Sequence, residues 1–230
     1  MLAASMRGRL AVRQLHALQG GELEIATVRS LAVGVLPAVI AEFRARHPGV
    51  RIWLREFGHR ERMNEAVLAG LSDIAVGPRP ADWKGQLLAL GWEEFVIVLP
   101  KDDPLAADGE PVSLRQLADR GWVLYEPGHG LNDVVLFACA QAGFTPRPSL
   151  RTGQAEAAVR LAASGLGVAL VPVNLVPDHL ERTIRHLRQP IVRQLAAYTR
   201  THFSPAAAAF AEAATATHRS SRPPRAIVFR

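Results

Sequence analysis

The sequence predicts an α/β protein built from strand and helix repeats, and three observations support this prediction. Residues 22–80 show a β-α-β-α-β pattern, and further strand and helix patterns follow between residues 113 and 172. Between these two series lies a polar, turn-forming segment, Lys101–Pro104. A chain of 230 residues with 49% hydrophobic side chains can form one large or two small cores, and we expect the chain to change domain at this segment.

The first unit opens with a short β-prone run at residues 23–28. The next apolar residues are spaced as on one face of a helix, at Leu36, Val39, Ile40 and Phe43. Pro37 is best tolerated in a first helical turn, so we expect the regular helix to begin there or to bend there. Residues 47–49 end this helix, and the alternation of apolar and polar side chains over residues 50–55 predicts a second strand.

A second helix and a third strand complete this unit. Gly58 and His59 end the second strand, and the spacing of Met63, Ala66 and Val67 predicts the next helix. Gly70 suits a left-handed residue at the end of that helix, and a short strand is expected at residues 74–76.

Three loops of this unit are expected to meet. Strands joined through helices run parallel, which places all strand-to-helix loops on one edge of the sheet. These loops are residues 28–30, 58–60 and 77–79. Open α/β sheets bind ligands beyond the carboxyl ends of their strands, where helix N-termini offer free N–H groups to an anion.

The second series begins after an apolar strand at residues 95–99. Ser113 and Gln116 have the spacing of a capping box. We expect a strand at residues 122–125, a loop at 126–130, and a helix capped by Asn132. A strand near residues 149–151, a helix over 154–163 and a buried strand at 168–172 follow, and further strands are expected at 184–187 and 192–199.

The two ends of the chain contain basic residues and no acidic ones, unlike the rest of the sequence. A final helix is expected to open at Ser204 and Pro205 and to run to about Ala214, followed by a disordered basic tail, residues 215–230. Residues 1–21 are helical in tendency and are interpreted as the remnant of a linker helix whose apolar face meets a second copy or another domain. The alternative is a frayed leader.

The net charge of +6 comes from the termini. Of 27 basic residues, seven lie in residues 1–21 and 215–230, and the rest of the chain has 20 basic against 21 acidic residues. Phosphate backbones are recognised by clustered basic side chains, so the body of the chain shows no nucleic-acid footprint. We expect any DNA contact to come from elsewhere.

The chain shows no signal for a membrane, a secretion route or a disulfide framework. Its apolar runs are shorter than the roughly 18 residues of a membrane span, and residues 1–18 lack the apolar core of a secretory signal. Cys139 is the single cysteine and lies on an apolar helical stripe, which favours a buried thiol. We therefore expect a cytoplasmic protein.

Six short motifs lie in a defined order between about residues 20 and 214. They are Gly21-Glu22-Leu23-Glu24-Ile25, Leu36-Pro37 with Phe43 and Pro48, Gly70-Leu71-Ser72-Asp73-Ile74-Ala75, Asp103-Pro104-Leu105-Ala106, residues 163–172 with Gly165 and Gly167, and Ser204-Pro205-Ala206-Ala207. In the order and spacing of these motifs, the chain resembles the effector-binding domain of LysR-type transcriptional regulators.

The resemblance implies two Rossmann-like subdomains of the type 2 periplasmic-binding-protein architecture, joined by two crossover segments. Subdomain I would comprise residues 22–99 and 196–214, and subdomain II residues 100–195. A small effector would bind in the cleft between them, and the protein would form homodimers or tetramers. The family's N-terminal winged helix-turn-helix has no match in this sequence, so DNA binding is expected only through such a module outside this chain.

The resemblance also implies which positions of this sequence would contact an effector. In the first subdomain they are Val28, Arg29, Ser30, His59, Gly77 and Arg79, and in the second Glu126, Pro127, Gly128, His129 and Gln154. Arginine and histidine side chains around a helix N-terminus suit an anion, so a carboxylate-bearing effector is the hypothesis. The alternative for Arg29 and Arg79 is a solvated charge at the rim, and His59 stands where the family more usually has a small hydroxyl residue.

Other functions find less support in the sequence. Gly165-Leu166-Gly167 lacks the last glycine of a dinucleotide fingerprint and precedes a strand, so we expect a turn. No HExxH, G-x-S-x-G or Walker motif occurs, and Ser30 with His59 lacks an orienting acid in the sequence. We expect no catalytic residues, metal or cofactor. A solute-binding protein of the same fold, which should carry a secretion signal, and an enzyme on the same scaffold remain the alternatives.

Overall fold

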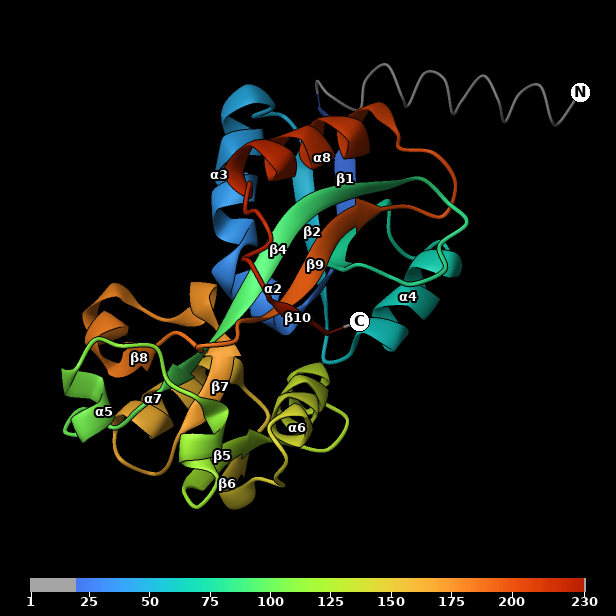
Figure 1. Cartoon of the computed structure of the whole chain (residues 1–230). Coiled ribbons are helices and arrows are strands. Elements are labelled where there is room, and N and C mark those ends of the chain that lie inside the picture. Colours follow the sequence, from blue (N-terminus) through green and yellow to red (C-terminus); the bar gives the residue numbers. More distant parts are fainter. Residues whose placement is uncertain (1–19, 230) are drawn as a thin grey trace, which may run out of the picture. The chain divides into compact units, whose positions relative to one another are not determined.

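The computed structural model describes residues 20–229, which divide into two compact units (Figure 1). Unit 1 contains residues 20–91 and 195–220, and unit 2 contains residues 92–194 and 221–229. The chain passes from one unit to the other within β4 (Leu87–Val98) and within β9 (Ile191–Tyr198). The first boundary falls after Gly91 instead of after Leu99, because β4 begins before the expected strand and its residues from Phe95 onward belong to the core of unit 2.

The sheet of unit 1 is parallel where the sequence predicts it. β1 (Glu22–Val28) lies between β2 (Arg51–Phe57) and β3 (Ile74–Pro78) and pairs parallel with both. Strand β9 pairs antiparallel with β3, with Gly77 opposite Ala196. The strand order in this unit is therefore β2-β1-β3-β9.

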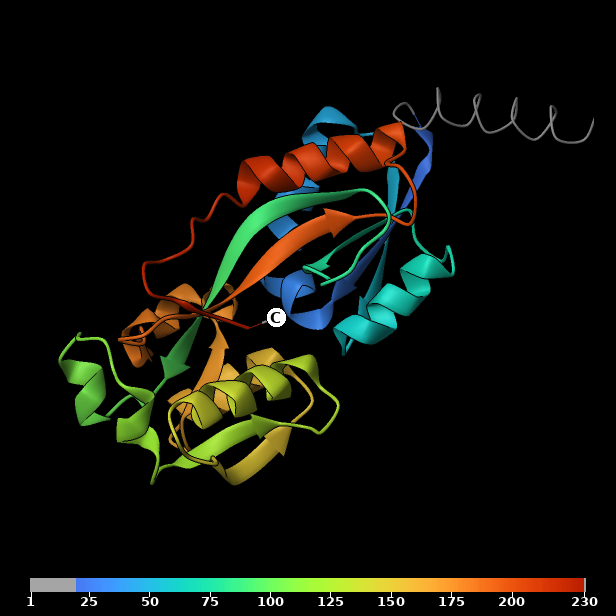
Figure 2. The same ribbon diagram turned by 45° about the vertical axis from the view of Figure 1, so that its right-hand side comes forward.

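Four helices belong to unit 1: α2 (Arg29–Gly34), α3 (Leu36–Arg46), α4 (Arg60–Leu68) and α8 (Pro205–Thr217). Pro37 lies in the first turn of α3, as expected, and α2 is a separate short helix before it. Helix α8 packs against α3 (Figure 2), where the rings of Phe43 and Phe210 meet edge to face at 5.3 Å. Ser204 caps α8 by accepting a hydrogen bond from the Ala207 N–H, at 3.2 Å.

Unit 2 contains two groups of strands. β4 pairs antiparallel with β7 (Ala169–Pro172) and β8 (Ile184–Arg185), while β5 (Gly121–Tyr125) and β6 (Arg147–Thr152) form a parallel pair. Its α-helices are α5 (Pro104–Ala107), α6 (Gly130–Gln141) and α7 (Ala155–Ala163), and 3-10 turns occur at Leu114–Leu117, Val173–Leu175 and Asp178–Thr183. Two α/β units are present, so the predicted fold class is confirmed.

The helix caps of unit 2 agree with the sequence at one position and differ at another. Ser113 and Gln116 form the expected capping box. Asn132 does not cap α6. The helix begins earlier, His129 is its N-cap, and Asn132 is buried inside the helix. Asparagine is preferred over histidine at the N-cap position. Here, however, the chain turns at Gly128 and the helix can start directly after that turn, so His129 becomes the N-cap.

The C-terminal segment is ordered from residue 215 to 229, contrary to the predicted disordered tail. Helix α8 continues to Thr217, and β10 (Ile227–Val228) pairs parallel with β9 at Ile191 and Val192. Within unit 2, Arg222 lies over the Trp92 ring at 5.6 Å, and Phe229 meets Phe137 at 5.4 Å. Composition predicted disorder, but the few apolar residues of this segment find partners on unit 2. The expected linker helix lies in residues 1–19, outside the described part.

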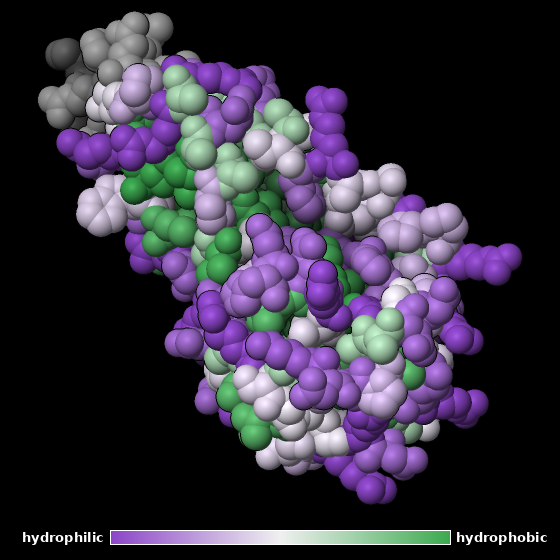
Figure 3. Space-filling model, turned by 90° about the vertical axis from the view of Figure 1, so that its left-hand side faces the viewer, coloured by the Kyte–Doolittle hydropathy of each residue, from purple (hydrophilic) through white to green (hydrophobic). Residues whose placement is uncertain are grey.

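The surface mixes polar and apolar residues, as the face drawn in Figure 3 shows. A few large hydrophobic side chains are exposed, including Trp53 on β2 and Leu136 on α6. Within residues 20–229, no helix combines the length and the apolar composition that crossing a membrane requires.

Candidate functional site

The three loops of unit 1 meet at the carboxyl edge of its sheet, as the sequence predicts. Val28 at the end of β1 pairs in register with Phe57 at the end of β2, and Thr27 pairs with Val76 of β3. The Thr27 hydroxyl also donates to the Val76 carbonyl at 2.8 Å, which ties β1 to β3 just before their loops. Parallel pairing therefore brings residues 28–30, 58–60 and 77–79 to one edge.

The first two loops touch through Arg29. Its guanidinium lies 3.5 Å from the point where a Cβ on Gly58 would stand, so it extends across the start of the second loop. Arg29 is exposed, whereas Val28 before it and Ser30 after it are buried. Of the first loop, only the arginine side chain faces solvent.

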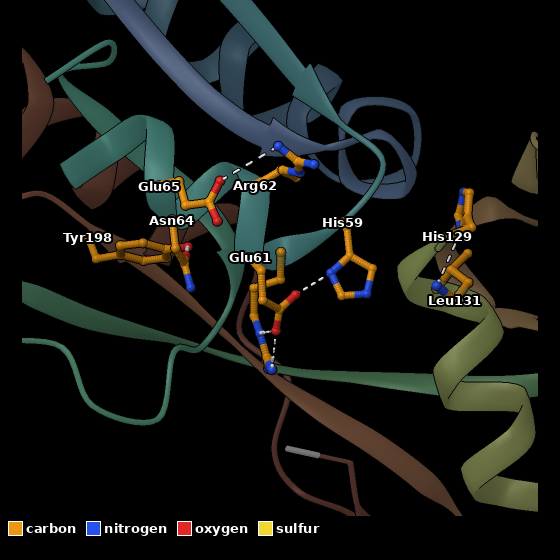
Figure 4. Close-up of polar contacts among 9 residues, drawn as sticks. His59, Glu61, Arg62, Asn64, Glu65, His129, Leu131 and Tyr198 are labelled. Atoms are coloured by element: carbon orange, nitrogen blue, oxygen red, sulfur yellow. Dashed lines mark hydrogen bonds and ion pairs between the residues drawn. The ribbon is translucent and has the colours of Figure 1, made fainter. Parts of the chain in front are cut away.

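His59 belongs to a charged cluster with Arg60 and Glu61 at the start of α4 (Figure 4). His59 Nδ1 and Arg60 Nη2 both contact the Glu61 carboxylate. Partial burial opposes ionisation of Glu61. The hydrogen bonds to its own N–H and to Arg60, with the charges of Arg60 and His59, outweigh that effect and lower the pKa of Glu61. Glu61 was not among the residues predicted from the sequence, although an acid two residues after His59 in a first helical turn was a usable signal.

Gly77 in the third loop is required by a close approach. A Cβ at this position would stand 2.3 Å from Met63 Cε. Tyr198 of β9 packs nearby and donates a hydrogen bond from its hydroxyl to Asn64 Oδ1, at 2.6 Å (Figure 4). Burial raises the pKa of Tyr198, so this hydroxyl stays protonated. Arg79 follows β3 and is exposed.

The predicted loops of unit 2 also meet, at the carboxyl ends of β5 and β6. Tyr125 pairs in register with Thr152, and the Glu126 N–H donates to the Thr152 carbonyl at 3.1 Å. The Glu126 carboxylate lies close to Gly153: a Cβ atom added to this glycine would stand 3.1 Å from Glu126 Oε2. The Gln154 N–H donates to the Thr152 hydroxyl at 3.2 Å, and Gln154 is the N-cap of α7. The structure therefore brings Glu126 into the neighbourhood of Gln154.

His129 is held firmly in place. It is 7% exposed, its ring stacks on Tyr125 at 5.0 Å with 15° between the planes, and its Nδ1 accepts from the Leu131 N–H at 3.2 Å (Figure 4). Gly128 before it has φ of +82°, a conformation that favours glycine. Pro127 and Gly128 are exposed at the tip of this loop.

Arg151 is a further cation at this edge of unit 2 that was not among the residues predicted from the sequence. Its Nη1 donates to the Tyr125 carbonyl at 2.8 Å and contacts Asn132 Oδ1 at 3.5 Å. It therefore connects the last residue of β5 with α6. Its sequence signal, a basic residue at the end of a strand, is too common to indicate this role.

Both edges carry polar and charged side chains. Unit 1 offers the exposed side chains of Arg29 and Arg79 and the charged cluster at His59, and unit 2 offers the Glu126 carboxylate and the Gln154 amide. Among residues 20–229, no three histidine, cysteine, aspartate or glutamate side chains are grouped so that they could hold a metal ion.

Two α/β units with polar strand-to-helix loops define a protein of the periplasmic-binding-protein fold class. The LysR substrate binding domain family matches residues 16–219, and the chain belongs to this family. The resemblance seen in the sequence is thereby confirmed.

The relatives by sequence are transcriptional regulators. A probable hydrogen peroxide-inducible genes activator of Mycobacterium avium is 33% identical over 157 residues, covering 67% of this chain and 50% of the relative. The transcriptional dual regulator GltC of Bacillus subtilis is 33% identical over 156 residues, covering 66% of this chain and 51% of GltC. The chain thus spans about half the length of these relatives.

Solved structures show the same fold. The C-terminal domain of a probable LysR family regulator from Rhodococcus sp. RHA1 has a TM-score of 0.71 and 24% identity, over 85% of this chain and 99% of that domain. The effector binding domain of QuiR, solved in complex with shikimate, has a TM-score of 0.70 and 17% identity, over 87% of this chain and 98% of that domain.

Proposed function

We propose that this chain is the effector-sensing domain of a LysR-type DNA-binding transcriptional regulator, and that it binds a small anionic metabolite. The family match over residues 16–219 carries this proposal. The exposed arginines at the loop edge of unit 1 support an anion, since guanidinium groups bind carboxylates with paired hydrogen bonds.

The proposed effector contacts are those expected from the sequence. In unit 1, Arg29 and Arg79 supply charge, Ser30 and the backbone of Val28 supply hydrogen bonds, and His59 acts together with Glu61. Gly77 contributes its backbone, since Met63 fills the place that a side chain there would take. In unit 2, Glu126 and Gln154 supply polar contacts, while Pro127, Gly128 and His129 shape the loop. Because the His59 side chain contacts Glu61, the second loop offers a donor and an acceptor in fixed positions.

Calorimetry with a panel of small organic acids tests the proposal. At least one acid should bind the wild type, and Arg29→Ala should bind that acid at least tenfold more weakly, because a charged hydrogen bond is lost. Arg44→Ala is the matched control, since Arg44 is equally exposed but lies in the last turn of α3. If wild type, Arg29→Ala and Arg44→Ala all ignore every acid, the anionic effector is wrong.

The remaining expectations concern the whole regulator. We propose that it acts in the cytoplasm as a homodimer or tetramer and contacts DNA through a winged helix-turn-helix. The relatives support this proposal, because they are regulators about twice as long as the matched segment. Analytical ultracentrifugation of this chain tests the assembly, and a purely monomeric species at micromolar concentration would contradict it.

A further inference from the structure

Unit 2 contains a cavity that none of the predicted effector contacts lines. It has a volume of about 500 Å³ and lies among the 3-10 turn at Leu114–Leu117, the C-terminal end of α6, the segment at residues 187–191 and β10. Ligand pockets commonly measure about 300–1,000 Å³, so this cavity can hold a small organic molecule.

The cavity is separate from the loops described above. His129 caps the N-terminal end of α6, whereas Gln141 and Gly143 line the cavity at the other end. Twelve helical residues at about 1.5 Å each put roughly 18 Å between the two ends. A ligand in this cavity would therefore not touch the loop of residues 126–129.

The lining has one sign of charge. Arg115 and Arg188 both line the cavity, and no aspartate or glutamate does. Within residues 20–229, neither guanidinium forms an ion pair with a carboxylate. Two unneutralised cations at the mouth of one cavity favour an anionic group there.

The two arginines are held differently. Arg188 Nε donates to the Pro111 carbonyl at 3.1 Å, and its backbone N–H donates to the Val112 carbonyl at 2.9 Å. These bonds fix the side chain and leave its two Nη groups for a ligand. Arg115 Nη2 lies 3.6 Å from the place of a Cβ on Gly143, at the end of α6, where the helix dipole also favours a positive charge. Arg188 is therefore the stronger anion ligand of the two.

One part of the cavity wall is apolar, and Ser113, Gln141 and Gln189 add neutral polar groups elsewhere in the lining. Val112, Leu114, Leu187 and Ile191 are buried side chains that line it, and Ile227 of β10 adds a further wall. An apolar body of a ligand would gain about 25 cal/mol for each Å² of surface that it buries against these side chains. A carboxylate at the arginines would then point toward solvent.

We propose that this cavity is a second ligand site, one that binds a small carboxylate with an apolar body. The ligand's carboxylate pairs with Arg188 and Arg115, and its apolar part lies against Leu187, Ile191 and Ile227. The proposal goes beyond the effector site, because its residues are distinct from the loop residues assigned there.

Octanoate is the probe, and octanamide is its neutral partner of the same length. Titration calorimetry should show octanoate binding to the wild type at least tenfold more tightly than octanamide. Arg188→Gln should weaken octanoate at least tenfold and leave octanamide unchanged, and Arg115→Gln should have a smaller effect. Arg160→Gln is the control, because Arg160 is an exposed arginine on α7 that does not line the cavity. This variant should bind octanoate as tightly as the wild type does.

A second measurement locates the probe. Gln141→Cys can be labelled with a fluorinated reagent, because Gln141 is exposed and the native Cys139 is buried. Octanoate should shift the fluorine resonance of this label, and Arg29→Ala in unit 1 should not alter its affinity. Equal affinity for octanoate and octanamide, full octanoate affinity in Arg188→Gln, or an unmoved resonance at saturating octanoate would each overturn the proposal. Failure of the effector panel would leave these results unaffected, which separates the two proposals.

Discussion

Gly77 shows how packing restricts the choice of a single residue in the third loop of unit 1. Gly77 lies on β3 next to the buried Met63 side chain. A Cβ atom added to Gly77 would stand 2.3 Å from Met63 Cε. Met63 is fully buried, so it has little space into which to move.

Gly77→Ala is therefore expected to lower the free energy of unfolding by about 1–3 kcal/mol, the range of overpacked cores. Urea denaturation measures this change. Gly58→Ala is the control in the neighbouring loop, because a Cβ there meets only Arg29 at an ordinary 3.5 Å. Equal stability of Gly77→Ala and Gly58→Ala would contradict the packing argument.

The histidines of the two predicted loops differ in a way that residue type alone does not reveal. His59 is partly exposed and contacts Glu61, whereas His129 is buried, caps α6 and stacks on Tyr125. Both follow a glycine in a loop after a strand, so the local sequence signals are nearly the same. The neighbours brought by folding make one histidine partly exposed beside a carboxylate and the other buried against an aromatic ring.

Among the elements, β4 and β9 share a buried ion pair in unit 2. Glu93 and Arg193 are 2% and 5% exposed, their side chains are paired, and Asn174 Nδ2 donates to Glu93 Oε1 at 3.1 Å. The Arg193 guanidinium also lies over the Phe95 ring at 5.3 Å. Since β4 and β9 are the strands in which the chain passes between its units, this pair fixes one strand against the other just inside unit 2.

Glu93→Ala is expected to lower the free energy of unfolding by about 3–5 kcal/mol, because it removes the carboxylate from a buried guanidinium. Arg51→Ala should change it by only about 0–1 kcal/mol, since its pair with Glu22 is exposed. Chemical denaturation measures both. Recovery of stability in Glu93→Leu with Arg193→Met would support the desolvation argument, and equal effects of the two alanine changes would contradict it.

At the scale of the whole molecule, buried ionisable groups set the response to alkali. Burial raises the pKa of Cys139 from 9.0 to about 12, and burial also raises the pKa values of Tyr125 and Tyr198. In the unfolded chain these groups lose their protons at lower pH than in the folded protein. The folded state is therefore fully stabilised below about pH 9 and loses stability as the pH rises toward 12.

Cys139→Ala should reduce this alkaline loss of stability. In the window from pH 9 to 12, the thiol contributes up to about 1.4 kcal/mol per pH unit to the decline. Denaturation midpoints measured at pH 7, 9 and 10.5 should fall less steeply for the variant, whatever its stability at pH 7. Parallel curves for wild type and variant would show that Cys139 does not titrate differently in the two states.

From the sequence alone, most helices and strands and their order could be predicted. Apolar spacing located α3, α4 and the parallel strands of unit 1, and strand-to-helix loops of parallel strands must share an edge. These signals are local, so residues close in the chain are enough to reveal them. The motifs that resemble the LysR family are local signals too. Their spacing along the chain follows the order of the helices and strands.

Tertiary structure alone decided which residues became partners. Glu93 meets Arg193 100 residues away, the segment at 221–229 is ordered on unit 2, and the cavity of unit 2 is formed by four separate segments. A charged or apolar residue carries the same local pattern whether it ends up exposed or paired in a core. Its environment follows from long-range packing, which no periodicity within one element encodes.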